Sequence, residues 1–174
     1  MTAVQVRPAR PEDAERVAEM ARVFKRGEGR PSERLTADVF RRDGFGNDPK
    51  FRCLVIEAAD RLVGFVLFAR GYSSEDAAVG YHIDDLYLEA SHRRRGIGRR
   101  VMSALARRCR DEGGAWLAWH VVPKNESADA FYDRLGAVRS DLRFRYLDGD
   151  DMLGLAAQDV DSGGFGRRRP PTNA

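Results

Sequence analysis

The sequence predicts an α+β fold in which a mixed, mostly antiparallel sheet is layered with helices, and three observations indicate it. The 174 residues are 43% apolar, which suits one globular domain with a core of its own. Two strand-like runs joined by the polar turn Ala59-Asp60 predict an antiparallel hairpin. Strand-like and helix-like segments then alternate up to Leu147. We expect the domain over residues 1–158 and a disordered tail rich in Gly, Arg and Pro over residues 159–174.

The first half is predicted to hold a strand, two helices and the hairpin. The strand covers residues 4–7. A helix begins near Pro11, because proline followed by acidic residues suits a first turn, and apolar residues then recur at helical spacing. Ser32 is expected to cap a second helix that ends at Gly44. The hairpin strands and the polar loop after them are expected at residues 51–58, 61–69 and 71–76.

The second half is predicted to alternate strands and helices. A strand over residues 79–88 carries two acids, Asp84 and Asp85, in an otherwise apolar setting. Residues 98–111 form an amphipathic helix with arginines on the face opposite its apolar stripe. The remaining elements are a strand at residues 115–122, a helix at 125–135 and a last strand at 142–147.

The charge pattern points to an anionic ligand. Thirty basic residues outnumber 27 acidic ones, and eight arginines fall within residues 93–110. A nucleic acid would call for base-stacking aromatics among these arginines, and the run has none. Apolar runs are too short to cross a bilayer, residues 1–10 lack the apolar centre of a secretory signal, and Cys53 and Cys109 have no metal or disulfide spacing. We expect a cytoplasmic protein that binds no nucleic acid, membrane or metal.

The segment Arg93-Arg94-Arg95-Gly96-Ile97-Gly98 lies between a predicted strand and a predicted helix. Two glycines one residue apart allow a tight turn, a positive φ and close approach of a ligand to the backbone. Amide groups here and the helix N-terminus form an anion site that suits a pyrophosphate. The segment is shorter than G-x-G-x-x-G, and G-x-x-x-x-G-K-[ST] is absent, so neither a dinucleotide fold nor a P-loop is indicated. The alternative is a turn that needs glycines only for its geometry.

Three motifs carry a resemblance to a known family. Arg93, Gly96 and Gly98 match the pattern Q/R-x-x-G-x-G/A, and so this segment resembles the acetyl-CoA loop of the GCN5-related N-acetyltransferases, the GNAT superfamily. Residues 83–88 resemble the central strand of that family. Residues 125–137, with Asn-Glu-Ser, Phe-Tyr and Gly-Ala, resemble its following helix. The motifs occur in the family's order and together cover about residues 51–147.

Within that family the chain is most similar to the diamine and spermidine (thialysine-type) branch. Residues 45–55, the strand acids and the Phe-Tyr helix resemble this branch. The branch usually has Glu then Asp in the strand, where this chain has Asp84 and Asp85. It has acidic and Trp positions before the last strand, where this chain has Ser140, Asp141 and Leu142. These differences bear on a polyamine substrate and leave the transfer chemistry intact.

The resemblance implies a GNAT fold whose splayed central strand pair forms an acetyl-CoA cleft. It further implies acetyl-CoA as cosubstrate without a metal, and a homodimer. The residues that it implies for binding the cosubstrate are Leu86, Tyr87, Leu88, Arg93, Arg94, Arg95, Gly96, Ile97, Gly98, Arg99, Asn125 and Tyr132.

Tyr132 and Asp84 are the predicted catalytic residues. A tyrosine pKa of about 10 lies above the roughly 8.5 of a thiol, and Tyr132 is expected to protonate the departing thiolate. Asn125, Ala128 and Tyr132 share one helix face and can address one elongated ligand. Asp84 matches the branch's carboxylate and, with a shorter side chain, is expected to deprotonate the amine through a water. Asp85 lies on the opposite side of the strand if no bulge intervenes, and helps to attract a cation.

The predicted function is transfer of an acetyl group from acetyl-CoA to a primary amine of a small molecule, such as a diamine, a polyamine or a lysine analogue. The amine would attack the thioester directly. One alternative is acetylation of a protein lysine or N-terminus. Another is a non-catalytic acyl-CoA-binding module, which would need neither Asp84 nor Tyr132. As alternatives to catalytic roles, Tyr132 could be an aromatic residue of the core, and Asp84 and Asp85 could satisfy buried backbone or arginine groups.

Overall fold

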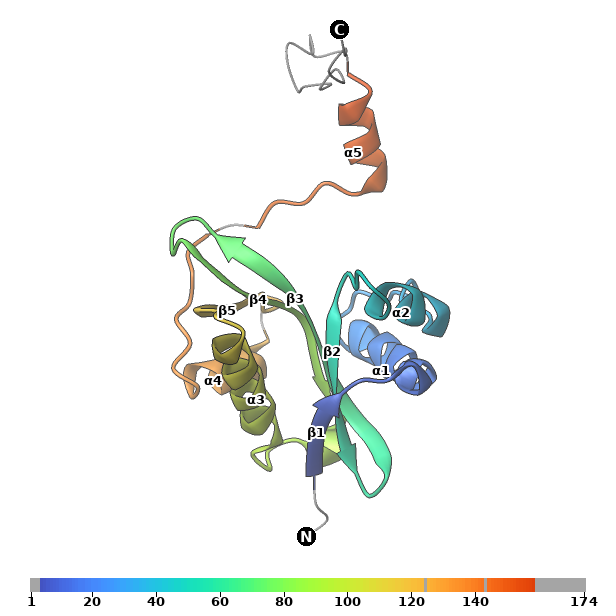
Figure 1. The fold of residues 1–174 in the computed structure, drawn as a ribbon, viewed down its shortest axis with the longest axis vertical. Helices are drawn as coiled ribbons and strands as arrows, with labels where there is room; N and C mark the ends of the chain where they lie inside the picture. Colours follow the sequence, from blue (N-terminus) through green and yellow to red (C-terminus); the bar gives the residue numbers. More distant parts are fainter. Residues whose placement is uncertain (1–3, 124, 143, 159–174) are drawn as a thin grey trace, which may run out of the picture. The chain divides into compact units, whose positions relative to one another are not determined.

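The computed structural model describes residues 4–123, 125–142 and 144–158, which separate into a unit ending at Ala137 and a unit beginning at Val138. The first unit is built on a five-stranded sheet, antiparallel except for its last pair of strands (Figure 1). In sheet order the strands are β1 (Val4–Pro8), β2 (Arg52–Ala58), β3 (Arg61–Ser73), β4 (Ala78–Leu88) and β5 (Trp116–Trp119). The predicted α+β class is confirmed.

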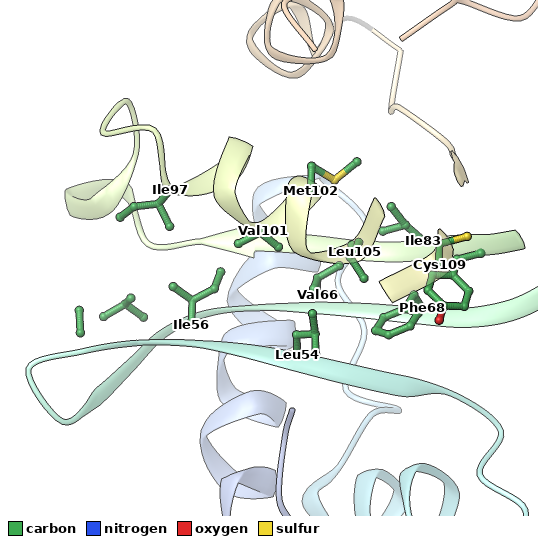
Figure 2. Packing of buried hydrophobic residues seen from close by; sticks show 13 residues of the cluster. Leu54, Ile56, Val66, Phe68, Ile83, Ile97, Val101, Met102, Leu105 and Cys109 are labelled. Atoms are coloured by element: carbon green, nitrogen blue, oxygen red, sulfur yellow. The ribbon is translucent and has the colours of Figure 1, made fainter. Parts of the chain in front are cut away.

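Helices cover both faces of this sheet (Figure 1). The helices of the first unit are α1 (Ala14–Gly27), α2 (Ala37–Gly44), α3 (Ile97–Asp111) and α4 (Glu126–Asp133). One buried cluster joins α1 and α2 to the sheet, and the other joins α3 and α4 to its opposite face. In the second cluster Val101, Leu105 and Cys109 of α3 face Leu54 and Phe68 of the sheet (Figure 2). The apolar stripe predicted for α3 is therefore the one that the sheet buries.

The β2–β3 hairpin turns where the sequence indicated. Ala59 and Asp60 both have a positive φ, 49° and 59°, as a two-residue turn between right-twisted strands requires. The strand β3 is longer than expected, because Gly71 and Tyr72 still pair with Gly80 and Val79 of β4. The loop predicted over residues 71–76 therefore starts later than expected.

The cap predicted for the second helix is wrong. Thr36, directly before α2, accepts a hydrogen bond from the Val39 N–H at 3.2 Å through its hydroxyl. Ser32 lies four residues farther upstream, where its hydroxyl accepts from the Arg34 N–H at 3.4 Å. A capping oxygen must belong to the residue at the helix start to reach the free N–H groups of the first turn.

The second unit contains the helix α5 (Gly149–Ala156), which the sequence analysis did not predict. Its start is marked by Asp148, whose carboxylate accepts from the Asp151 N–H at 3.2 Å. The strand predicted over residues 142–147 is wrong, because its described residues pair with no other strand. Alternating apolar residues favour a strand, but only a neighbouring ladder can satisfy its backbone. The tail predicted over residues 159–174 lies outside the described residues.

Each described helix is shorter, or less apolar, than one that could cross a membrane.

Candidate active site

The loop before α3 presents a row of backbone N–H groups without acceptors. Gly96 caps α3 in the left-handed region at φ 76°, and Arg94 has a φ of 59°. Within the described residues, the amide groups of residues 94–99 donate no backbone hydrogen bond outside the helix. The first N–H groups of a helix have no partner within it and carry the positive end of its dipole. The predicted loop therefore has the donor set that a phosphate needs.

Two arginines tie this loop to neighbouring elements. The Arg93 Nε donates to the Leu88 carbonyl at 2.7 Å, and its guanidinium lies over the Tyr87 ring at 5.9 Å. The Arg99 Nη2 donates to the Arg134 carbonyl at 2.5 Å. Arg94 and Arg95 are exposed, and neither makes a hydrogen bond or ion pair with a described residue. The loop is thus held by Arg93 and Arg99, with Arg94 and Arg95 open to an anion.

The strands β4 and β5 part beside this loop. Their parallel pairing runs from Gly80 opposite Trp116 to Ile83 opposite Trp119, while β4 continues to Leu88. Beyond Ile83, no described strand therefore pairs with β4 on the side of β5, and this stretch includes Leu86 and Leu88. The predicted splayed strand pair is present, with the backbone of β4 free to pair with an amide-containing chain.

The side chains of two residues predicted to bind the cosubstrate lie in the core instead. Tyr87 is buried against Phe24 and Phe65, with ring centroids 5.8 and 6.1 Å apart. Ile97 is also buried, in the cluster that joins α3 to the sheet.

Gly98 brings the start of α3 against α4. A Cβ at this position would lie 3.0 Å from the Phe131 Cζ, closer than ordinary side-chain contacts allow. A side chain at the second glycine of the motif would therefore press on the Phe131 ring, which would have to shift by a few tenths of an ångström. This close approach positions the neighbouring residue on α4, Tyr132.

Tyr132 belongs to α4, and its ring packs against the end of β5. Its ring centroid is 4.8 Å from that of Trp119 and 5.0 Å from that of Phe131. Burial, with the nearby negative charge of Glu28, raises the pKa of the Tyr132 hydroxyl from about 10 to about 12. The hydroxyl therefore keeps its proton at neutral pH, as a general acid must.

Asn125 acts as the N-cap of α4. Its side-chain oxygen accepts from the Ala128 N–H at 3.1 Å, and the residue is exposed. The cap uses the side-chain carbonyl and leaves the side-chain NH₂ group for another partner. Asn125 therefore fixes the start of the helix that carries Tyr132.

A β-bulge decides where the two strand acids point. Opposite β3, Leu67 pairs with Asp85 and Phe68 pairs with Ile83, so Asp84 is the extra residue. Ile83 keeps its side chain in the α3 cluster, whereas Asp85 is directed to α1. Without the bulge, strict alternation would place Asp85 on the same face as Ile83. The sequence prediction placed Asp85 on the side of the strand opposite Asp84 on the condition that no bulge intervenes. The bulge at Asp84 means that this condition is not met.

Two residues that the sequence analysis missed complete this region. The Lys25 Nζ lies 2.5 Å from the Asp85 Oδ1 and 4.0 Å from the Glu28 Oε2. Burial raises the pKa of the 3% exposed Asp85, and the ion pair with Lys25 opposes this. Asp84 is exposed and near enough for its charge to act on Asp85. No local motif marks Lys25 or Glu28, since both follow the buried stripe of α1.

These groups fit the chemical parts of acetyl-CoA. The free amides and exposed arginines before α3 match a diphosphate, and the unpaired backbone of β4 matches the amides of a pantetheine. Tyr132, still protonated at neutral pH, can give a proton to a thiolate.

Relatives that are similar to this sequence are named as acetyltransferases. The family model described as "Acetyltransferase (GNAT) family" matches residues 15–137. The mouse (Mus musculus) thialysine N-epsilon-acetyltransferase is 28% identical over 172 residues, which cover 91% of this chain and 100% of the enzyme. The Arabidopsis thaliana L-ornithine N5-acetyltransferase is 34% identical over 95 residues. That match covers 54% of this chain and 42% of the plant enzyme.

Solved structures share the fold at low sequence identity. An integron cassette protein from the mobile metagenome of V. cholerae superposes with a TM-score of 0.75 at 20% identity, covering 88% of this chain and 98% of its own. An aminoglycoside N-acetyltransferase, solved in complex with CoA, has a TM-score of 0.71 at 16% identity and covers 86% and 97%. With the family match over residues 15–137, the motif order and the confirmed fold, the chain belongs to the GNAT family of acetyl-transferring enzymes.

Proposed function

We propose that this enzyme transfers the acetyl group of acetyl-CoA to a primary amine of a small cationic molecule, such as a diamine, a polyamine or a lysine analogue. One observation carries the proposal: the charge of Glu28 acts on both Tyr132 and Asp85, and the exposed Asp84 lies beside Asp85 on β4. Relatives named for thialysine and ornithine, which both carry a side-chain amine, support this class of acceptor.

The cosubstrate would be held by the loop and by β4. The amides of residues 94–99, with Arg94 and Arg95, would bind the diphosphate, and the backbone at Leu86 and Leu88 would bind the pantetheine arm. The side-chain NH₂ of Asn125 would add a contact. Bound acetyl-CoA supplies a thioester carbonyl that an amine can attack. Oriented N–H donors on β4 would stabilise the negative charge that develops on its oxygen.

Asp84 would take the proton of the acceptor ammonium through a water. The neighbouring carboxylate is engaged, because Lys25 holds Asp85 in a buried ion pair. Asp84 is exposed and makes no hydrogen bond or ion pair with a described residue. It is therefore the strand carboxylate open to an incoming amine.

Tyr132 would return a proton to the departing thiolate. A phenol with a pKa of about 12 is fully protonated when the reaction begins. Transfer to a thiolate of pKa about 8.5 is then uphill, so a group that lowers the phenol's pKa in the complex would assist it. The charge of Glu28 opposes ionisation of Tyr132, and an acceptor cation bound near Glu28 would offset that charge.

The charge balance favours an acceptor with more than one ammonium group. Three acidic side chains, Glu28, Asp84 and Asp85, lie in this region, and Lys25 supplies one basic side chain, which pairs with Asp85 and Glu28. A second ammonium on the acceptor could approach Glu28 while the reacting amine approaches Asp84. A neutral acceptor would leave this excess charge uncompensated.

We propose further that the enzyme is a homodimer. The second unit carries large apolar side chains that remain exposed, among them Leu142 at 88% and Tyr146 at 74%. Single exposed apolar residues are ordinary on a protein surface, but a run of them marks an interaction surface. A second copy of the chain would cover them.

The proposed function is tested by measuring thiol release from acetyl-CoA against a panel of acceptors. The panel contains spermidine, ornithine, thialysine, neutral primary amines, and peptides with a lysine or a free N-terminus. We expect the small dicationic amines to have the highest kcat/KM. A preference for the peptides would replace the small-molecule acceptor with a protein, and binding of acetyl-CoA without turnover on any amine would indicate a non-catalytic module.

A further inference from the structure

A groove runs between β1 and α3, and Gly96 and Arg99 of the proposed cosubstrate loop line one end of it. It contains a cavity of about 580 Å³ and continues into a second of about 380 Å³, and both are lined by Val6, Ala104 and Arg107. Val4 and Val6 of β1 form one wall, and α3 forms the other. This face of α3 is distinct from the face that Gly98 turns to Phe131.

The larger cavity has a strongly cationic wall. Arg99, Arg100 and Arg107 line it, and no acidic residue does. Arg100, Ser103 and Arg107 follow one another at helical spacing, so they lie along one face of α3. Within the described part of the chain, Arg107 makes no hydrogen bond or ion pair. The larger cavity therefore holds positive charge that its own lining does not neutralise, whereas the smaller cavity is lined by Asp111 and Glu112 as well as by Arg107 and Arg108.

The other wall is the free edge of a strand. The order of the sheet begins with β1, which among the described strands pairs with β2 alone. The Arg100 Nη2 donates to the Val4 carbonyl at 2.8 Å, so the backbone of Val4 points away from β2. Alternate residues of a strand direct their N–H and C=O groups to the same edge, which places Val6 on this edge too. Pro8, next on that edge, has no N–H to offer.

We propose that this groove binds an extended acidic segment of a partner protein, which adds a strand to β1 and directs its carboxylates to α3. An unpaired strand edge offers backbone hydrogen bonds to an extended peptide, and alternate side chains then decide its specificity. Arg100 and Arg107 lie about 10 Å apart along the helix axis, and carboxylates two residues apart on a strand lie about 7 Å apart, within reach of long arginine side chains. The apolar side chains of Val4 and Val6 would accept apolar residues between the acids.

The test is fluorescence anisotropy of the full chain with a fluorescein-labelled octapeptide of alternating Asp and Val. Arg107→Glu should weaken binding about tenfold or more, because it replaces an attraction by a repulsion inside the groove. Arg110→Glu is the matched control: Arg110 is exposed on the same helix, pairs with Asp111 and does not line the groove. It should change the affinity less than about twofold. Equal weakening by both variants would mean attraction to overall charge alone and would overturn the proposal.

Two further measurements test the strand addition and the identity of the site. Two such peptides are compared, one N-methylated at its odd residues and one at its even residues, which are the two registers of methylation. The peptide whose methylated amides face β1 should lose binding, because it cannot donate backbone hydrogen bonds to β1. Unchanged binding by both registers would overturn the strand addition. Saturating CoA should leave the peptide bound, and displacement would assign it to the cosubstrate cleft. A DNA oligonucleotide that binds more tightly than the peptide and is equally sensitive to Arg107→Glu would assign the groove to nucleic acid.

Discussion

The Lys25 Nζ at the end of α1 lies 2.5 Å from the Oδ1 of Asp85 in β4, and the Asp85 side chain is almost completely buried. The ammonium of the protein thus occupies the position beside a strand carboxylate that a substrate ammonium would otherwise take. Asp84, one residue earlier and exposed by the bulge, remains open.

Lys25→Met should lower the free energy of unfolding at neutral pH by about 1–3 kcal/mol, because it leaves the buried Asp85 carboxylate without a partner. Denaturant unfolding measures this change. The double variant Lys25→Met/Asp85→Asn serves as the control and should recover most of the loss. If the single and double variants are equally unstable, the ion pair is not what stabilises Asp85.

Tyr132→Phe should lower kcat by about a hundredfold or more with little change in affinity for acetyl-CoA, because it removes the hydroxyl and keeps the ring contacts with Trp119 and Phe131. Steady-state kinetics and calorimetry together separate the two effects. A variant with unchanged turnover would remove Tyr132 from the mechanism.

Asp84→Asn should reduce kcat and shift the rise of activity to higher pH, because only already deprotonated amine can then react. The pH profile of kcat/KM measures this. Asp85→Asn, at the neighbouring position, should leave the shape of that profile unchanged, since Asp85 is held by Lys25. A shifted profile in Asp85→Asn alone would exchange the roles of the two acids.

Gly96→Ala should weaken CoA binding about tenfold, because a Cβ would stand among the amides that face the diphosphate. Gly113→Ala is the matched control at the other end of α3. Both glycines have a φ of 76°, and a Cβ at either would meet nothing within 4 Å. We expect both variants to lose about 1 kcal/mol of stability from backbone strain. Calorimetry that finds equal CoA affinity in both would contradict the phosphate site.

The lowered pKa of Glu112 predicts how the stability of the first unit changes as the pH falls. Burial acts to raise its pKa, but hydrogen bonds from Tyr81 and Arg52 and the charge of Arg52 outweigh burial and lower the pKa to about 2. A lowered pKa in the folded state means stability that is present above the unfolded value of about 4.5 and is lost as pH falls toward 2. Glu112→Gln should be less stable at neutral pH and lose less stability over that range, as measured by unfolding at a series of pH values. Parallel curves for the two proteins would refute this role of Glu112.

Local sequence determined those elements and motifs whose conformation depends only on residues that are close together in the sequence. The turn at Ala59-Asp60, the glycine loop before α3 and the apolar stripe of that helix need only near neighbours, since φ preferences and helical spacing are local properties.

Tertiary structure alone decided which charges meet. The ion pair of Lys25 with Asp85 joins residues 60 positions apart, and the bulge that turns Asp85 toward α1 depends on how β3 pairs with β4. The influence of Glu28 on Tyr132 likewise spans most of the first unit. The spacing of residues in the sequence does not predict such pairs, because packing between elements sets the distance between their charged groups. The strand expected at residues 142–147 is wrong for the same reason, since a strand needs a partner strand that its own residues cannot supply.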